Sequence, residues 1–227
     1  MEPETFFPPF VSTLSAARET QVRLRSRVRF APLPLGRIRR VGAADVTFLG
    51  PKDLVAAVIV VVDLATKAVL EEKSAVGRVR FPYVPGYLTF REGPAVVAAW
   101  RKLSRKPDVM LFDGHGTAHP RRFGIASHLG VLLSVPSVGC AKKRLVGDHD
   151  PPGPRKGDAA PLLLDGEAVG AAVRTRAGVK PVFVSPGHRV SLETAVRLTL
   201  ACTTRFRLPE TTRWAHRLAS EIGRAHV

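Results

Sequence analysis

Apolar and polar residues change their spacing along the chain, and the changes divide it into segments. Over 15–29, apolar residues recur at helical spacing among many charges, which predicts an opening helix that ends at the turn containing Pro32 and Pro34. Short apolar runs follow at 41–48, 55–63 and 67–76, with turn residues between them. These runs predict three antiparallel strands.

The remainder alternates between helical and strand-like spacing, apart from two segments rich in proline and glycine, 81–86 and 146–158, which predict loops. Helices are expected over 91–103, 124–133, 191–205 and 210–223. Further strands are expected over 109–112, 137–142, 162–175 and 181–185. A β-meander followed by alternating elements predicts an α/β fold in which helices flank a mixed central β-sheet, as one domain spanning 1–227.

The charge balance favours a polyanionic partner. Lys and Arg total 35 against 19 Asp and Glu, a formal net charge of +16. The longest apolar stretch, 54–62, is far shorter than the roughly 20 residues of a membrane-spanning helix, and the first residues lack the pattern of a secretory signal. We therefore expect a cytoplasmic monomer that binds nucleic acid and not a membrane.

The two cysteines fit the same setting. Cys140 and Cys202 both lie in apolar segments, where a buried thiol is the expected state. A disulfide or a zinc site built on cysteine is not predicted.

The segment 108–122, Asp-Val-Met-Leu-Phe-Asp-Gly-His-Gly-Thr-Ala-His-Pro-Arg-Arg, predicts an active site. A buried strand delivers Asp113 into a turn rich in glycine and histidine, and α/β sheets place their chemistry at the carboxyl ends of such strands. The alternative is that Asp113 only caps the turn.

Two further carboxylates belong with Asp113. Asp45 interrupts an apolar strand, where an acid is costly unless it is paired or binds a cation, and Glu92 stands near the start of a helix. Acids on neighbouring strands suit Mg²⁺, which takes one or two carboxylates plus water and phosphate oxygens. The alternatives are a strand-edge aspartate that faces water and a glutamate favoured by the helix dipole.

Several basic side chains accompany these acids. His119 is expected near the phosphate or the metal, His115 in a turn, and His128 in the core. Lys142 and Lys143 follow an apolar strand, where an ammonium could reach a phosphate or could simply be solvated.

The segment 81–87, Phe-Pro-Tyr-Val-Pro-Gly-Tyr, is the other unusual feature. Two prolines stiffen a loop with aromatic and apolar tips, and such a wedge can insert among stacked bases. The alternative is a loop folded back on the core.

These segments together resemble the endonuclease V family, the deoxyinosine-directed nucleases with an RNase H-like fold. The resemblance rests on the following segments: Gly-Ala-Ala-Asp-Val-Thr-Phe at 42–48, Phe-Pro-Tyr-Val-Pro-Gly at 81–86, Phe-Arg-Glu at 90–92, Asp-Gly-His-Gly-Thr-Ala-His-Pro-Arg-Arg at 113–122, Gly-Cys-Ala-Lys at 139–142, Ser-Pro-Gly-His at 185–188 and Thr-Arg-Trp-Ala-His at 212–216. The chain departs from the family's usual residues at Ala44, Val84 and Trp214, where relatives usually carry a larger apolar residue, isoleucine and leucine.

The resemblance implies roles for the candidate residues. The metal ligands would be Asp45 and Asp113, and Glu92 would be catalytic by supporting the metal-bound water or would act as a further ligand. The other catalytic residues would be Lys142, which would steady the phosphate or the leaving group, and His119 and His216, in or beside the site. Nucleic acid would be contacted by Pro82, Tyr83, Val84 and Pro85 of the loop and by Arg121 and Arg122. Tyr83 would fill the gap left when the deaminated base is turned out of the stack.

The resemblance also implies an activity. We expect a DNA-repair endonuclease that uses Mg²⁺, with Mn²⁺ able to substitute, and that cuts DNA on the 3′ side of deoxyinosine. Two alternatives stay open: an endoribonuclease acting on inosine in RNA, and a non-catalytic nucleic-acid-binding module.

Overall fold

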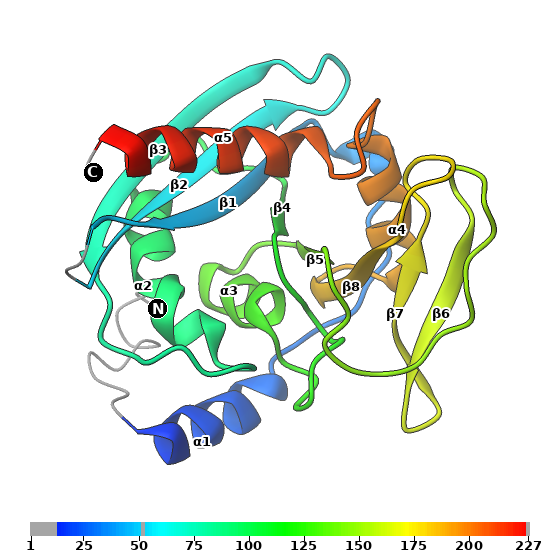
Figure 1. Ribbon diagram of the computed structural model, residues 1–227, viewed down its shortest axis with the longest axis horizontal. Coiled ribbons are helices and arrows are strands. Elements are labelled where there is room, and N and C mark those ends of the chain that lie inside the picture. The colour runs from blue at the N-terminus through cyan, green and yellow to red at the C-terminus, as the bar shows by residue number, and fades with distance from the viewer. Residues whose placement is uncertain (1–12, 51–52, 226–227) are drawn as a thin grey trace.

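The computed structural model describes residues 13–50 and 53–225, and its strands form one sheet (Figure 1). Within these residues the strands are β1 (Arg40–Phe48), β2 (Leu54–Asp63), β3 (Val69–Arg78), β4 (Val109–Phe112), β5 (Ser137–Ala141), β6 (Ala159–Leu164), β7 (Glu167–Val173) and β8 (Val182–His188). The helices are α1 (Leu14–Arg25), the short 3₁₀ helix η2 (Leu35–Arg37), α2 (Leu88–Arg101), α3 (Ile125–Leu133), α4 (Leu192–Ala201) and α5 (Glu210–Ala225).

The sheet is mixed, as predicted. Its order is β3-β2-β1-β4-β5-β8-β7-β6. The predicted antiparallel meander is confirmed in β1, β2 and β3, while β4 runs parallel to both β1 and β5. Strands β1, β4 and β5 therefore run in the same direction in the middle of the sheet, and β1 continues past Ala44, which pairs with the last residue of β4.

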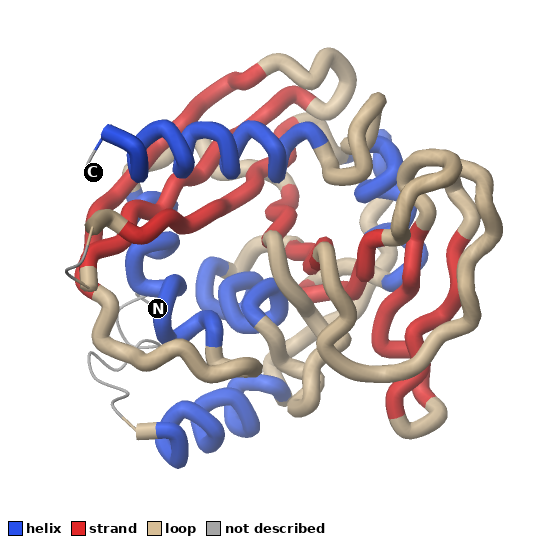
Figure 2. Tube along the Cα trace, in the orientation of Figure 1, coloured by secondary structure: helices blue, strands red, loops and turns tan. Residues whose placement is uncertain are grey.

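Helices cover both faces of this sheet (Figure 2). Strand β2 shows why: Val55, Ala57 and Ile59 face a core shared with α2 and α3, whereas Val58 and Val60 face a second core shared with α4 and α5. A strand that is apolar at every position, rather than at alternate ones, is typical of burial on both faces.

Helix α5 approaches the sheet closely because small residues line its inner side. Ala215 and Ala219 are buried, and Gly223 lies so near β1 that a Cβ there would stand 2.8 Å from the Thr47 Oγ1 atom. The close packing of α5 on β1 and β2 brings polar residues of this helix beside the end of β1.

The structure corrects the strand predicted over 162–175. This segment is a hairpin of β6 and β7, turned at Asp165 and Gly166, whose φ angles of 52° and 78° are both positive. Asp-Gly is a strong signal for such a two-residue turn, and the apolar residues on both sides concealed it.

Helix boundaries differ from the prediction by three residues or more at three places. The first helix ends at Arg25 with Ser26 as its cap, α2 begins at Leu88 rather than at 91, and α4 ends at Ala201 rather than at 205. Cys140 and Cys202 are both buried free thiols, as predicted. No helix in the described ranges combines the length and apolar character needed to cross a bilayer.

Candidate active site

Asp45 and Asp113 lie next to each other on neighbouring strands. The parallel register of β1 and β4 pairs Ala43 with Leu111 and Ala44 with Phe112, so the two aspartates occupy the next position along the pair. Both continue the alternation of residues that face α5. The predicted convergence of two carboxylates on neighbouring strands is therefore observed.

Each aspartate is contacted by a basic side chain from another element. His216 of α5 donates from Nδ1 to the Asp45 Oδ2 atom at 2.8 Å. Lys142, directly after β5, donates from Nζ to the Asp113 Oδ2 atom at 2.6 Å. Four predicted residues, distant in sequence, thus form one cluster.

Glu92 belongs to the same electrostatic environment. Burial raises the pKa of Glu92 to about 7, and the negative charges of Asp45 and Asp113 add to the increase. Burial also raises the pKa of Asp45, although its contacts with His216 oppose the change. Glu92 stands in the second turn of α2, whose first turn has no acid, so the helix dipole does not explain its position.

The donor set suits a hard divalent cation. Three carboxylates repel one another here, and a cation would relieve the repulsion. Across 13–50 and 53–225, no three His, Cys, Asp or Glu side chains converge closely enough to hold an ion alone. An ion bound by Asp45 and Asp113 would complete its coordination with water or substrate oxygens, as Mg²⁺ commonly does.

The loop 81–87 projects beside this cluster, with its tip in solvent. Tyr83 is 71% exposed, and Pro82 and Pro85 are exposed as well. At the loop base, the Phe81 ring is buried and its centroid lies 5.5 Å from that of Phe90. The loop is therefore rooted in the core while its tip is free to reach a ligand.

Three donors fix the loop at one carbonyl. The Gly86 oxygen accepts hydrogen bonds from Gln21 Nε2 at 2.9 Å, His119 Nε2 at 2.9 Å and Arg121 Nη2 at 2.8 Å. The Arg121 guanidinium also lies 4.2 Å from the centre of the Tyr87 ring. This three-donor clamp holds the end of the loop in one position.

His119 lies in this clamp rather than against the carboxylates. Its Nδ1 atom accepts the backbone N–H of Arg121 at 3.1 Å, so both ring nitrogens are bonded to backbone groups. Burial lowers the pKa of His119 to about 4, which keeps the ring neutral at physiological pH. The position expected near phosphate or metal is thus a position that supports the loop.

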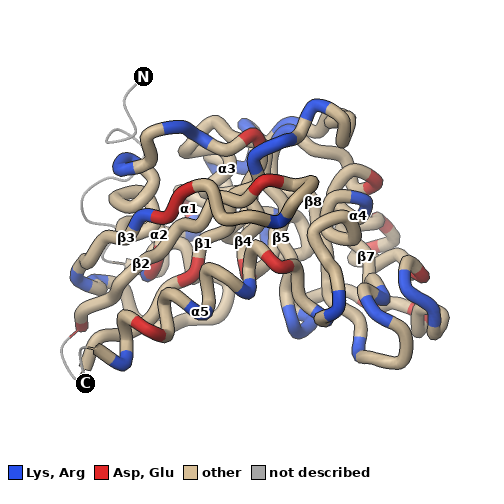
Figure 3. Tube along the Cα trace, turned by 90° about the horizontal axis from the view of Figure 1, so that it is seen from above, with Lys and Arg blue, Asp and Glu red and all other residues tan. Residues whose placement is uncertain are grey.

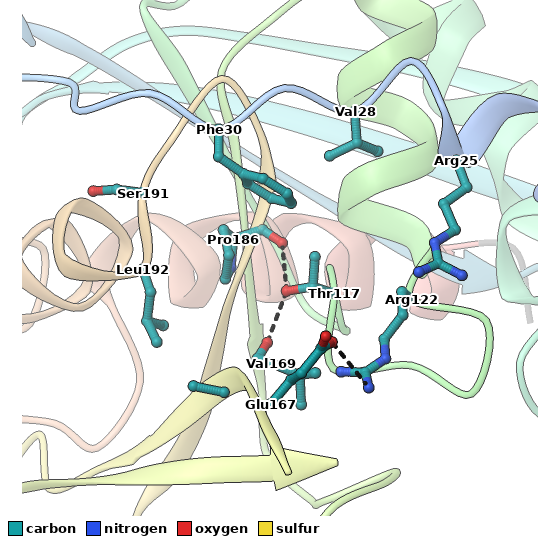
Figure 4. A pocket seen from close by; sticks show the side chains of 11 residues that line it. Arg25, Val28, Phe30, Thr117, Arg122, Glu167, Val169, Pro186, Ser191 and Leu192 are labelled. Carbon is teal, nitrogen blue, oxygen red and sulfur yellow. Dashed lines mark hydrogen bonds and ion pairs between the residues drawn. The ribbon is translucent and has the colours of Figure 1, made fainter. Parts of the chain in front are cut away.

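Arg121 and Arg122 also have partners within the chain. Arg122 donates to the Leu164 carbonyl at 2.7 Å and lies 3.5 Å from the Glu167 carboxylate. Figure 4 shows this contact beside a cavity of about 390 Å³ between the end of α1, β7 and the start of α4. None of the three carboxylates lines that cavity, although it is the largest of those described.

A smaller cavity, of about 180 Å³, adjoins the loop 81–87. Its walls come from the loop itself, the glycine-rich turn after Asp113 and the start of α3; the lining includes Tyr83, Gly114, His115 and Ile125. The turn packs directly on the backbone of β8, because a Cβ on Gly116 would stand 2.1 Å from the Pro186 carbonyl oxygen.

Sequence reasoning missed Gln21. It is buried to 1% exposure on the inner side of α1, and its Oε1 atom accepts from Arg121 Nε at 2.5 Å. Only its polarity on an otherwise small or apolar helix face could have identified it. His128, predicted as a core residue, is fully buried between the rings of Phe90 and Phe123.

Comparison with known proteins identifies the family. The family model for endonuclease V matches residues 22–217. The chain belongs to the endonuclease V family. An endonuclease V from Myxococcus xanthus is 51% identical over 213 residues, which cover 94% of this chain and 91% of the relative.

Solved endonuclease V structures share the architecture. The crystal structure from Streptomyces avermitilis has a TM-score of 0.89 at 48% identity and covers 94% of each chain. The Ciona intestinalis endonuclease V, solved in complex with a 24mer DNA containing an inosine followed by a ribo-adenosine, has a TM-score of 0.83 at 26% identity and covers 93% of this chain and 98% of its own. The mixed sheet and its helices are thus the RNase H-like fold that the resemblance implies.

Membership of the endonuclease V family makes this chain a nuclease of DNA repair, in a family of metal-dependent enzymes. Its basic residues lie along helices and loops around the whole outline (Figure 3). Charge alone therefore does not locate the surface of this chain that contacts nucleic acid, and specific contacts must do so.

Proposed function

We propose that the protein is a Mg²⁺-dependent endonuclease that recognises deoxyinosine in DNA and hydrolyses a phosphodiester bond on its 3′ side. The observation that carries the chemistry is the side-by-side placement of Asp45, within β1, and Asp113, directly after β4, each contacted by a basic side chain. The inosine-containing DNA in the Ciona relative supports the choice of lesion.

The carboxylates and their partners divide the work of hydrolysis. Asp45 and Asp113 would hold the divalent cation, which when bound would supply activation of water and neutralisation of charge on the scissile phosphate. Glu92, with its raised pKa near 7, accepts a proton from the attacking water. Lys142 keeps Asp113 in place and presents its remaining N–H groups to a phosphate oxygen.

His216 acts on the outer side of the same cluster. Its side chain is 65% exposed while Nδ1 is bonded to Asp45, so the rest of the ring stays accessible from the outer side. In the imidazolium form, in which both ring nitrogens carry hydrogen, Nε2 donates to the phosphate or to the leaving oxygen.

Lesion recognition falls to the loop 81–87 and its cavity. Tyr83, with Pro82, Val84 and Pro85, enters the base stack, and the extruded base occupies the cavity of about 180 Å³ behind the loop. Gln21, His119 and Arg121 keep the loop ready, so little ordering is needed on binding. Arg121 and Arg122 can bind phosphates only by releasing their present partners within the chain.

Inosine in RNA is the second candidate substrate. The specific observation in its favour is the ribo-adenosine that follows inosine in the DNA bound to the Ciona relative. Whichever substrate it cuts, we propose that the protein acts as a monomer in the cytoplasm.

One cleavage experiment separates these functions. Matched DNA and RNA strands with and without inosine are incubated with the full chain in Mg²⁺, in Mn²⁺ and with chelator. We expect metal-dependent nicking 3′ to inosine in DNA, faster than in RNA. Faster cutting of RNA supports the second candidate, whereas binding in a gel shift without nicking in either metal leaves a non-catalytic module.

A further inference from the structure

A cavity of about 290 Å³ at the start of α5 has no part in the chemistry described above. It is lined by aromatic and charged side chains of α5 and of the loop before it: Arg205, Phe206, Glu210, Arg213, Trp214 and Arg217. We call these six residues the arginine–aromatic cluster.

The arginines of the cluster stack on its aromatic rings. The Arg213 guanidinium carbon lies 3.2 Å from the centre of the Phe206 ring, and that of Arg205 lies 4.8 Å from the same centre. Arg217 lies 5.3 Å from the centre of the Trp214 ring. Stacking uses the flat face of a guanidinium and leaves the N–H groups in its plane to bind an anion.

The acid in the cluster is already engaged. Glu210 accepts from Arg213 Nη1 at 2.9 Å through Oε2 and from the Thr204 hydroxyl through Oε1. It therefore orients Arg213 instead of repelling an incoming anion. The lining has three arginines and one glutamate, and Glu221 beside it pairs with Arg217, so the cluster keeps a net positive charge when both acids are counted.

The cluster adjoins the active site on two sides. Arg207, in the same loop as Arg205, donates from Nη2 to the Lys142 carbonyl at 2.8 Å. On α5, His216 lies between Arg213 and Arg217 in sequence, and its side chain contacts Asp45. These contacts place the cluster next to the carboxylates, on the side of His216 and Lys142.

We propose that the arginine–aromatic cluster is a phosphate subsite that grips the backbone of the substrate strand adjacent to the scissile bond. The inference rests on the proposed function for the direction of the strand. The ligand chemistry is a nucleic-acid phosphodiester, because fixed guanidinium planes match phosphate oxygens and the nearest neighbouring site is built for phosphate.

The α4 helix offers a matched control for the test. Arg217 is paired with Glu221 at 2.9 Å and its side chain is 64% exposed; Arg197 is paired with Glu193 at 3.5 Å and its side chain is 63% exposed. Both pairs have i,i+4 spacing on a helix, but Arg197 does not line the cavity. Arg217→Gln and Arg197→Gln thus remove the same charge from similar surroundings.

The experiment measures binding of the full chain to duplex DNA across a salt series, with chelator present to prevent cleavage. We expect Arg217→Gln to reduce the slope of log affinity against log salt by about 1, and Arg205→Gln with Arg217→Gln by about 2. Arg197→Gln should keep a slope close to that of the unmodified protein. Equal slopes for Arg217→Gln and Arg197→Gln would overturn the proposal.

Two further measurements distinguish a phosphate subsite from a site for acidic protein, and failure of this proposal from failure of the proposed function. If the double variant loses binding to polyglutamate but keeps the DNA slope, the cluster is a site for acidic protein and the proposal fails. Failure of the unmodified protein to cut inosine DNA would reject the proposed function alone, because the salt slopes are measured without cleavage. Thermal unfolding of each variant verifies that its fold is intact.

Discussion

The carboxylate cluster and the loop 81–87 lie close together but are held in opposite ways. In the cluster, Asp45 and Glu92 are ionisable groups whose pKa values are raised by burial and by neighbouring negative charge. In the loop, neutral His119 and the amide of Gln21 satisfy the Gly86 carbonyl through ordinary hydrogen bonds. In the cluster, like charges repel one another and a bound cation would relieve that repulsion. The loop, in contrast, is held in one conformation without any ligand.

The contrast separates two requirements of the proposed reaction. A metal site gains affinity when its ligands repel one another in the free protein, since binding removes that repulsion. A wedge gains affinity when it is rigid before binding, since no conformational entropy is then lost on contact. Substitutions should therefore affect chemistry at one region and substrate recognition at the other.

The largest expected effect is at the aspartates. Asp113→Asn or Asp45→Asn should reduce single-turnover cleavage by about 10³-fold or more, because each removes a charge that the proposed metal site needs and that is worth several kcal/mol to the transition state. DNA affinity measured with chelator should stay near that of the unmodified protein. Cleavage at the original rate by both variants would reject the metal assignment.

Tyr83→Ala should have the next largest effect. Loss of a stacking side chain costs about 1–3 kcal/mol, so kcat/KM on inosine in duplex DNA should fall about tenfold to a hundredfold. Because the side chain is 71% exposed, the unfolding temperature should stay constant.

Single-stranded inosine DNA is the control for Tyr83. It has no duplex stack to open, so its cleavage by Tyr83→Ala should change much less. Tyr83→Phe keeps the ring and should retain most activity on the duplex. Equal losses on both substrates for Tyr83→Ala contradict a role in opening the duplex.

Gln21→Leu tests the clamp that holds the loop. It removes the hydrogen bond that Gln21 Nε2 donates to the Gly86 carbonyl and the one that Gln21 Oε1 accepts from Arg121 Nε. Their loss should cost about 1–3 kcal/mol of stability. We expect KM for inosine DNA to rise several-fold while kcat at saturation stays nearly unchanged. Thr20→Val, a buried neighbour on the same helix, is the control and should leave KM unaltered.

The smallest effect concerns stability and pH. The pKa of Glu92 is raised to about 7, so the native state keeps a proton that the unfolded chain loses near 4.5. The stabilisation that this bound proton gives the native state is complete below about pH 4.5 and is lost as the pH rises through about 7. Glu92→Gln lacks the titration and should become progressively more stable than the unmodified protein over that range.

Thermal unfolding in chelator between pH 4 and pH 9 measures this difference. We expect the gap in unfolding temperature between Glu92→Gln and the unmodified protein to be near zero at the acid end, to widen to about 10 degrees and to level off above neutrality. A constant gap across the range would show that Glu92 does not titrate differently in the folded state.

Local patterns were sufficient for most of the elements and for the acids. Asp113 follows a short apolar run and Asp45 interrupts another, and both signals come from a few adjacent residues. The hairpin of β6 and β7 was missed because the apolar content of 162–175 outweighed the Asp-Gly turn signal. Gln21 gave almost no local signal, since its partners are 65 and 100 residues away.

The sequence by itself determined the α/β class, the doubly buried central strands and the proline-stiffened loop, because these depend on side-chain spacing along the backbone. Only the tertiary structure decided that the charges of Asp45, Glu92 and Asp113 interact with one another. It also decided that His119 bonds to the loop and not to the carboxylates. The physical reason is that burial, charge interaction and hydrogen-bond partnership depend on which distant segments meet, and strand register and helix packing set that.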